Sequence, residues 1–192
     1  MAINLGVLSM FLFNKNSHFN AANLITFANI AFGVTAIYFT VKGDFFTAII
    51  LAWIAGVLDI ADGKVARKFN LSTEFGVQVD SFADFISFVI MPSFLVFYAL
   101  QKTTMIEEIL AGVIFIIYII AGLRRLVEFN LKVEAGEVAK YFEGVPTPLG
   151  AILLWVIYLI YSYGVISNLY VILALVMAIS MSLNSKLKIP HP

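Results

Sequence analysis

Four aspartates lie at helical spacing in an otherwise apolar part of the sequence. Asp59 and Asp62 are separated by three positions, and Asp80 and Asp84 by four. On a helix, each of these spacings places both carboxylates on one face. In a membrane-spanning helix each such acid costs about 2.5 to 3.5 kcal/mol, which favours a function for the group. Carboxylate oxygens are ligands that Mg²⁺ and Mn²⁺ prefer, and four acids neutralise two divalent ions. We therefore predict that Asp59, Asp62, Asp80 and Asp84 bind two divalent cations, Mg²⁺ or Mn²⁺.

The segment between the two acid pairs combines small and basic residues, in the sequence DGKVARKFNLSTEFG (62–76). Gly63 and Ala66 leave room for a flat, bulky group, and the Arg67 guanidinium offers fixed donors to phosphate oxygens. Two other interpretations are open at this point. Arg67 or Lys64 would neutralise the acids in ion pairs, with the small residues serving helix packing, or the acids would form the cation site of a transporter.

The composition indicates that lipid surrounds the protein. Of the 192 residues, 61% are hydrophobic, and the mean hydropathy of +0.97 exceeds what a soluble core of this size buries. The net charge is zero and the basic residues form local clusters, so we expect no nucleic-acid partner. The absence of cysteine excludes disulfides, a thiolate nucleophile and a cysteine zinc site, so oxygen must hold any metal.

Six apolar runs are long enough for membrane-spanning helices, which need about 20 residues each. They cover residues 23–41, 45–68, 74–100, 106–130, 147–164 and 168–187. We predict an all-α integral membrane protein with one domain, residues 1–192, and six transmembrane helices within 23–187. A short interfacial helix is expected within 1–19. The acids fall on the second and third helices, whose short connection makes them antiparallel, and Gly63 and Gly76 are expected to let these two backbones approach closely.

The basic residues are distributed unequally between the two sides of this six-helix arrangement. Lys42 and Lys102 would lie on one side and the other ten on the opposite side. The side with more Lys and Arg is expected to be cytoplasmic, so we predict a multi-pass protein of the cytoplasmic membrane whose acids face the cytoplasm. The ten residues are Lys15, Lys64, Arg67, Lys68, Arg124, Arg125, Lys132, Lys140, Lys186 and Lys188.

A fixed pattern connects the acids to the small and basic residues. Residues 59–84 spell Asp59-x2-Asp62-Gly63-x2-Ala66-Arg67-x8-Gly76-x3-Asp80-x3-Asp84. This pattern resembles the complete signature of the CDP-alcohol phosphatidyltransferase family, and eight fixed positions within 26 residues make the match specific. The resemblance implies six helices, a dinuclear metal site on the four aspartates, Asp84 as the general base, a CDP-lipid substrate, contact with membrane lipids, and a homodimer. It also implies that the CDP moiety is held by Gly63, Ala66, Arg67 and Gly76.

A polar stripe marks the first predicted helix, where Asn23, Thr26 and Asn29 recur every three residues. Asn23 and Thr26 are candidates for contacts with the cytidine or ribose of the nucleotide. The alternative is that the stripe joins helices to one another through polar contacts.

Residues 122–150 resemble the phosphatidylserine synthase branch of the family. In that branch the fourth helix ends in a pattern like Leu-Arg-Leu-Ala-Arg-Phe-Asn, followed by Phe-x-Gly-Leu-Pro-x-Pro. The chain differs at Arg124, where a leucine is usual, and at Glu128, where a second arginine is usual, which suggests a charge swap. The matching residues are Arg125, Leu126, Phe129, Asn130, Phe142, Gly144, Val145, Pro146, Thr147 and Pro148.

The resemblance implies serine as the acceptor of the phosphatidyl group. A serine pocket needs donors for the carboxylate, which Arg125 and Asn130 offer, and an acceptor for the ammonium, which Glu143 or a nearby carbonyl offers. Arg124 and Arg125 project about 100° apart on a helix, so we expect only Arg125 to enter the pocket. An inositol phosphate or glycerol phosphate acceptor is the alternative. The acceptor candidates are Arg125, Asn130, Glu143 and Thr147.

Overall fold

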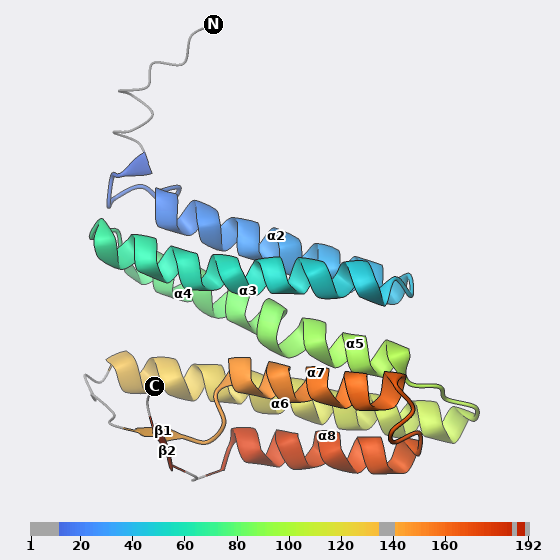
Figure 1. Ribbon diagram of the computed structural model, residues 1–192. Coiled ribbons are helices and arrows are strands. Elements are labelled where there is room, and N and C mark those ends of the chain that lie inside the picture. The colour runs from blue at the N-terminus through green and yellow to red at the C-terminus, as the bar shows by residue number, and fades with distance from the viewer. Residues whose placement is uncertain (1–11, 135–140, 186–187, 191–192) are drawn as a thin grey trace, which may run out of the picture.

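Long helices that run along one common axis make up most of the structure (Figure 1). The computed structural model describes residues 12–134, 141–185 and 188–190. Within them a π-helical segment, η1 (Phe85–Ile90), joins α4 to α5, so that residues 74–99 form one continuous helix. The α-helices are α2 (Ala21–Val41), α3 (Phe45–Lys68), α4 (Glu74–Asp84), α5 (Met91–Ala99), α6 (Met105–Glu134), α7 (Thr147–Ser162) and α8 (Leu169–Leu183).

Polar side chains cap the beginnings of several helices and thereby fix where each one starts. Each cap accepts a hydrogen bond from a backbone N–H of the first turn, which has no partner within the helix. At Asp44 the hydrogen bonds from Thr47 also lower the pKa of the carboxyl. The capping residues are Asn20 on α2, Asp44 on α3, Thr73 on α4 and Asn168 on α8.

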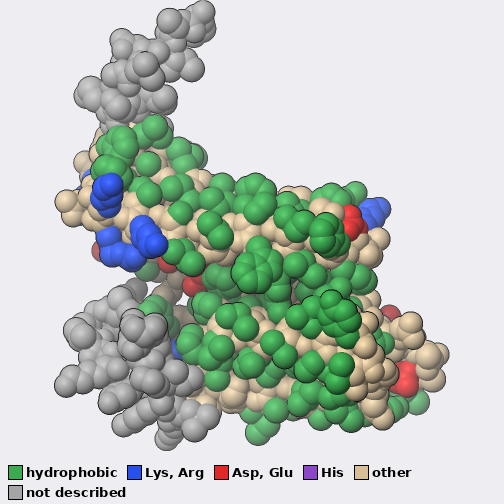
Figure 2. Space-filling view, viewed as in Figure 1, with side chains coloured by type: hydrophobic (Ala, Val, Ile, Leu, Met, Phe, Trp, Pro, Cys, Tyr) green, Lys and Arg blue, Asp and Glu red, His purple; other side chains and the backbone are tan. Residues whose placement is uncertain are grey.

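The outer surface is suited to lipid. Figure 2 shows hydrophobic side chains along the length of the helices, with Lys and Arg side chains gathered mainly at one end. Among the described residues, four helices are long and apolar enough to cross a membrane, whereas α7 and α8 have only 16 and 15 residues. The chain is therefore a multi-pass, predominantly helical membrane protein. The four long helices are Ala21–Val41, Phe45–Lys68, Glu74–Ala99 and Met105–Leu131.

Two cores hold the helices together, and the helix formed by residues 74–99 belongs to both. The first core lies between α2, α3 and α5, where the fully buried Ala36 and Ala48 allow close helix packing around Met91 and Leu95. The second and larger core joins η1 and α5 to α6, α7 and α8. In Figure 1 the corresponding groups of helices lie on either side of this shared helix. Its amino-terminal half carries Asp80 and Asp84.

The shared helix continues through Pro92, although proline has no N–H to donate. The π-helical segment ends at Ile90, two residues before this proline, and the N–H of Met91 bonds to the carbonyl of Ile86, five residues earlier. π-Helical turns are rare and often lie at functional sites. This one begins directly after Asp84.

The predicted bounds agree with most helices but are wrong at the carboxyl end of the chain. The last helix was expected to reach residue 187, but α8 ends at Leu183. Two short strands that the sequence did not predict, β1 (Tyr141–Glu143) and β2 (Lys188–Pro190), pair antiparallel. Beside them Gly144 has a φ of +80°, and an added Cβ would lie 2.5 Å from the carbonyl oxygen of Leu183. The chain before α7 therefore turns tightly against the end of α8.

The predicted interfacial helix within residues 1–19 falls largely on residues 1–11, which lie outside the described residues. Residues 13–20 form turns that lead into α2.

Candidate functional site

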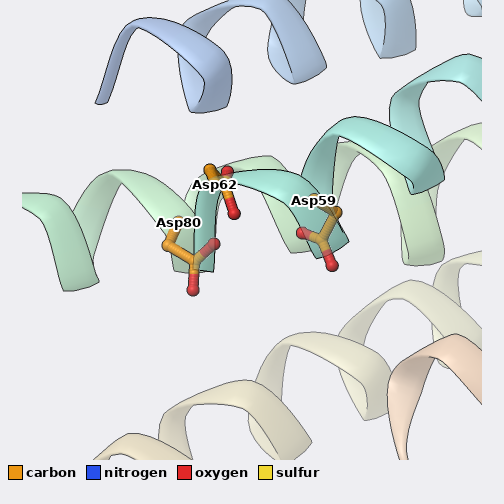
Figure 3. A group of neighbouring side chains, drawn as sticks. All are labelled: Asp59, Asp62 and Asp80. Atoms are coloured by element: carbon orange, nitrogen blue, oxygen red, sulfur yellow. The ribbon is translucent and has the colours of Figure 1, made fainter. Parts of the chain in front are cut away.

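Three carboxylates from two neighbouring helices lie together (Figure 3). Asp59 and Asp62 come from α3 and Asp80 from α4, and one oxygen of each lies within 4.8 Å of the other two. Asp62 is buried, while Asp59 and Asp80 are partly buried. Figure 3 shows the carboxylates of Asp62 and Asp80 turned toward one another. Because all the donors are hard oxygens at close spacing, the group fits a divalent cation.

Asp84 lies one helical turn after Asp80 and is adjacent to this group. Its carboxyl is within hydrogen-bonding reach of the Asp59 carboxyl. The structure therefore brings all four predicted acids together. Asp59, Asp62 and Asp80 form the mutual cluster, and Asp84 joins it through Asp59.

Among the described residues, no basic side chain forms an ion pair with the cluster. In the part of the chain that the structure describes, no Lys or Arg lies within 4.0 Å of these carboxylates, and the ion pair seen there joins Arg124 to Glu128 at 2.8 Å. Both Lys64 and Arg67 are exposed. The interpretation in which Lys64 or Arg67 pairs with the acids is therefore wrong.

Helix α2 supplies hydrogen-bond donors to the acids. The Thr26 hydroxyl donates to Asp62 Oδ2 at 2.7 Å, and Asn29 Nδ2 donates to Asp59 Oδ1 at 3.3 Å. Thr26 and Asn29 are both buried. Such partners hold ligating carboxylates in a fixed orientation. The polar stripe on α2 thus joins helices, as one interpretation expected, and does so at the acids.

Two serines that were not predicted from the sequence form hydrogen bonds with candidate site residues, Ser87 with Asn29 and Ser81 with Asn130. The Ser87 hydroxyl donates to Asn29 Oδ1 at 2.7 Å, and Asn130 Nδ2 on α6 donates to the Ser81 hydroxyl at 2.8 Å. A signal for Ser87 was present, because it follows Asp80 by seven positions and Asp84 by three, the spacing of a single helix face.

A cavity of about 190 Å³ adjoins the cluster on the side of α2. Its walls come from the first turns of α2, the last turns of α3, the α3–α4 connection and the start of α4. Asp62 and Asp80 form part of the wall, so the cavity reaches the acids. The six residues predicted to bind a nucleotide all line it: Asn23, Thr26, Gly63, Ala66, Arg67 and Gly76.

The two glycines have different neighbours from those expected. A Cβ on Gly76 would lie 2.8 Å from Asn23 Oδ1 on α2, and a Cβ on Gly63 would lie 3.3 Å from the guanidinium of Arg67. The prediction that Gly63 and Gly76 let α3 and α4 approach each other is therefore wrong. Gly76 instead admits the Asn23 side chain, and Gly63 leaves space for Arg67.

The acceptor candidates lie in different surroundings. Arg125 is 6% exposed, whereas the Arg124 side chain is 66% exposed and pairs with Glu128. Asn130 contacts α4 through Ser81, next to Asp80.

The two remaining acceptor candidates are Thr147 and Glu143. Thr147 is buried at the start of α7, and no hydrogen bond between described residues links it to the aspartates. Glu143 lies in β1, and its side chain is outside the described part of the structure.

Comparison with known proteins agrees with this arrangement. The family model for CDP-alcohol phosphatidyltransferase matches residues 19–181, which include every residue of the acid cluster and the cavity. The chain belongs to the CDP-alcohol phosphatidyltransferase family. The resemblance of residues 59–84 to the signature of that family is confirmed.

Several relatives within the CDP-alcohol phosphatidyltransferase family are about 30% identical to the chain. The CDP-diacylglycerol–serine O-phosphatidyltransferase of Bacillus subtilis is 30% identical over 169 residues, 88% of each chain. The Helicobacter pylori protein of the same name (strain ATCC 700392 / 26695) is 30% identical over 131 residues, 68% of this chain and 54% of that protein. The archaetidylserine synthase of Methanothermobacter thermautotrophicus is 30% identical over 154 residues, 79% of this chain and 63% of that protein. The chain thus spans about half the length of the Helicobacter relative.

Proposed function

We propose that the protein transfers the phosphatidyl group of a CDP-activated lipid to the hydroxyl of L-serine and releases CMP. The observation that carries the proposal is the carboxylate cluster at the wall of the α2–α3–α4 cavity. Membership of the family supports the class of reaction and favours an enzyme over a cation transporter. The names of the three relatives support serine as the acceptor.

In this proposal Asp59, Asp62, Asp80 and Asp84 hold two divalent cations, Mg²⁺ or Mn²⁺. When bound, such ions polarise the pyrophosphate of the CDP-lipid and neutralise charge on the departing CMP. Hydrogen bonds from α2 keep Asp59 and Asp62 oriented, so the carboxylates need little rearrangement to act as ligands.

The cavity beside the acids would hold the CDP moiety. Gly63, Ala66 and Gly76 carry little or no side chain, which leaves its wall open to a flat ring and a pyrophosphate. The exposed guanidinium of Arg67 at the same wall would donate to phosphate oxygens. Asn23 and Thr26 complete the wall on α2. This arrangement would place the pyrophosphate next to Asp62 and Asp80.

The chemical step would form a bond between the serine oxygen and the phosphorus adjoining the lipid, while the bond from this phosphorus to the CMP oxygen breaks. CMP leaves with the bonding electron pair, and Asp84 accepts the proton of the serine hydroxyl. Arg125 and Asn130 would bind the serine carboxylate. Glu143 and Thr147 are the other candidates for contacts with the acceptor.

The reaction predicts a specific dependence of CMP release on serine and metal. Purified protein in detergent, given CDP-diacylglycerol, should release CMP only when serine is added, because water is a poor substitute for a bound acceptor. EDTA should stop the release, and Mg²⁺ or Mn²⁺ should restore it. CMP can be measured by chromatography. Equal CMP release without serine would contradict the proposed transfer to an alcohol. Release that requires glycerol phosphate or inositol phosphate would instead identify that compound as the acceptor.

We further propose that all six helices cross the cytoplasmic membrane, with the acid cluster facing the cytoplasm, and that the protein is a homodimer. Helices α7 and α8 span only about 24 and 22 Å at 1.5 Å per residue, less than the hydrocarbon thickness of about 30 Å. Residues 144–146 and 184–185 adjoin these helices at the cytoplasmic end and would extend their path across the bilayer.

The orientation can be tested with single cysteines, because the natural chain has none. Lys68 and Lys42 are exposed at opposite ends of the bundle. In intact cells, a membrane-impermeant maleimide should label Lys42→Cys and leave Lys68→Cys unlabelled until the membrane is permeabilised, as expected from the positive-inside rule. Labelling in the reverse pattern would place the acids on the outer side.

A further inference from the structure

A chain of hydrogen bonds runs from the π-helical segment to the acid cluster. The Ser87 hydroxyl donates to Asn29 Oδ1 at 2.7 Å, and Asn29 Nδ2 donates to Asp59 Oδ1 at 3.3 Å. Ser87 is 6% exposed and Asn29 is fully buried. These two hydrogen bonds thus link the helix formed by residues 74–99, through α2, to a carboxylate of α3.

The chemistry of the three groups fixes the direction of both bonds. An ionised carboxylate only accepts hydrogen bonds, so the amide of Asn29 must turn its nitrogen toward Asp59 and its oxygen away. That oxygen is buried and needs a donor, which the Ser87 hydroxyl provides. Without Ser87, the amide oxygen would lose its partner, and the amide plane that directs Nδ2 toward Asp59 would be less firmly held.

The surrounding backbone is arranged to admit Ser87. Gly33 lies one turn after Asn29 on α2, and a Cβ at this position would be 2.8 Å from the Ser87 hydroxyl oxygen. The contact therefore depends on a glycine at residue 33. Ser87 itself lies within η1, and π-helical turns are often found at functional sites.

We propose that Ser87 is a positioning residue for Asp59, acting through Asn29, and that it tunes the affinity of the acid cluster for a divalent cation. The inference rests on the proposed metal-dependent function. A residue that served helix packing alone would affect stability but not the intrinsic affinity of the folded protein for the ion.

The test is a Mn²⁺ titration of purified protein without substrate, in which electron paramagnetic resonance measures the Mn²⁺ that remains free. Loss of the direct outer partner of a ligand lowers metal affinity about 10- to 100-fold, which is the rise in the Kd for Mn²⁺ expected for Asn29→Ala. Ser87 acts on Asp59 only through Asn29, so Ser87→Ala should raise the Kd in the same direction by a smaller factor, about 3- to 10-fold. Ser180→Ala is the matched control, because Ser180 is also buried but donates only to Val176 within its own helix. Its Kd should change less than about threefold.

A double-mutant cycle tests whether Ser87 acts through Asn29. In an Asn29→Ala background, Ser87→Ala should cause no further loss of Mn²⁺ affinity, since the two residues would act in series. If Ser87→Ala does not fold, Gly33→Ala provides the second variant, because its added Cβ should displace the Ser87 hydroxyl and raise the Kd in the same direction.

The outcomes separate this inference from the proposed function. If Ser87→Ala binds Mn²⁺ with wild-type affinity, Ser87 has no positioning role; if only Gly33→Ala folds, wild-type affinity in that variant leads to the same conclusion. The role of Ser87 is also overturned if the loss of affinity caused by Ser87→Ala adds fully to the loss caused by Asn29→Ala. In both cases the metal site itself would stand. A wild-type protein that binds no Mn²⁺ would instead overturn the metal-dependent function, and the inference with it.

Discussion

Asp80→Asn should abolish phosphatidyl transfer and at the same time raise the thermal stability of the metal-free protein. The amide keeps the shape of the side chain but removes a negative charge from three carboxylates whose oxygens lie within 4.8 Å of one another. Losing a cation ligand should forfeit several kcal/mol of transition-state stabilisation, which corresponds to about a thousandfold or more in kcat/KM. Without metal, the same change relieves repulsion between like charges, so Tm should rise.

Two measurements check this expectation, namely CMP release with saturating Mg²⁺ and thermal unfolding in EDTA. Glu108→Gln is the control, because Glu108 is an exposed acid on α6 at the opposite end of the bundle and should affect neither measurement strongly. An active Asp80→Asn variant would exclude the cluster as the metal site. An inactive variant with a lowered Tm in EDTA would indicate a structural role for Asp80 instead.

Arg125→Ala should weaken serine binding far more than binding of the CDP-lipid. Arg125 is buried, and its guanidinium would pair with the serine carboxylate in both the ground state and the transition state. The KM for serine should therefore rise with little change in kcat. Removing one partner of a buried charge pair costs about 2 to 5 kcal/mol, which is roughly thirtyfold to several thousandfold in kcat/KM.

Two other arginines, Arg124 and Arg67, provide the comparison for this variant. Arg124→Ala should change the KM for serine less than about threefold, because Arg124 is exposed and its pair with Glu128 is a surface ion pair. Arg67→Ala should raise the KM for the CDP-lipid instead, since Arg67 lines the cavity beside the acids. If Arg125→Ala leaves the KM for serine unchanged, the assignment of residues 122–150 to serine binding is wrong, while the family assignment stands.

The location of the acids could be predicted from the sequence because it depends on helix geometry alone. Asp59 and Asp62 share a face of any helix, and the predicted helix 45–68 has the same bounds as α3. The short connection to residues 74–100 makes the next helix antiparallel, which brings Asp80 near them. Apolar length and residue spacing were sufficient for these steps.

The rotation of the helices about their axes could not be predicted in the same way. Membrane helices are apolar around most of their circumference, so the pattern does not show which face meets which neighbour. For this reason Gly76 was assigned to the contact between α3 and α4, whereas it faces Asn23 on α2. The pairing of Ser87 with Asn29 was missed for the same reason. β1 and β2 were missed because three residues are too few to show an alternating pattern.

The order of the hydrogen-bond partners along the chain has a consequence for synthesis. Thr26 precedes its acceptor Asp62 by 36 positions in the sequence, and Asn29 precedes its acceptor Asp59 by 30. During translation the donors therefore leave the ribosome before Asp62 and Asp59, since a chain emerges from its amino-terminal end. A carboxylate that is costly in lipid then meets a donor as soon as the α2–α3 hairpin inserts. The hairpin can thus enter the bilayer with its acids already partnered, before the helix that carries Asp80 has entered it.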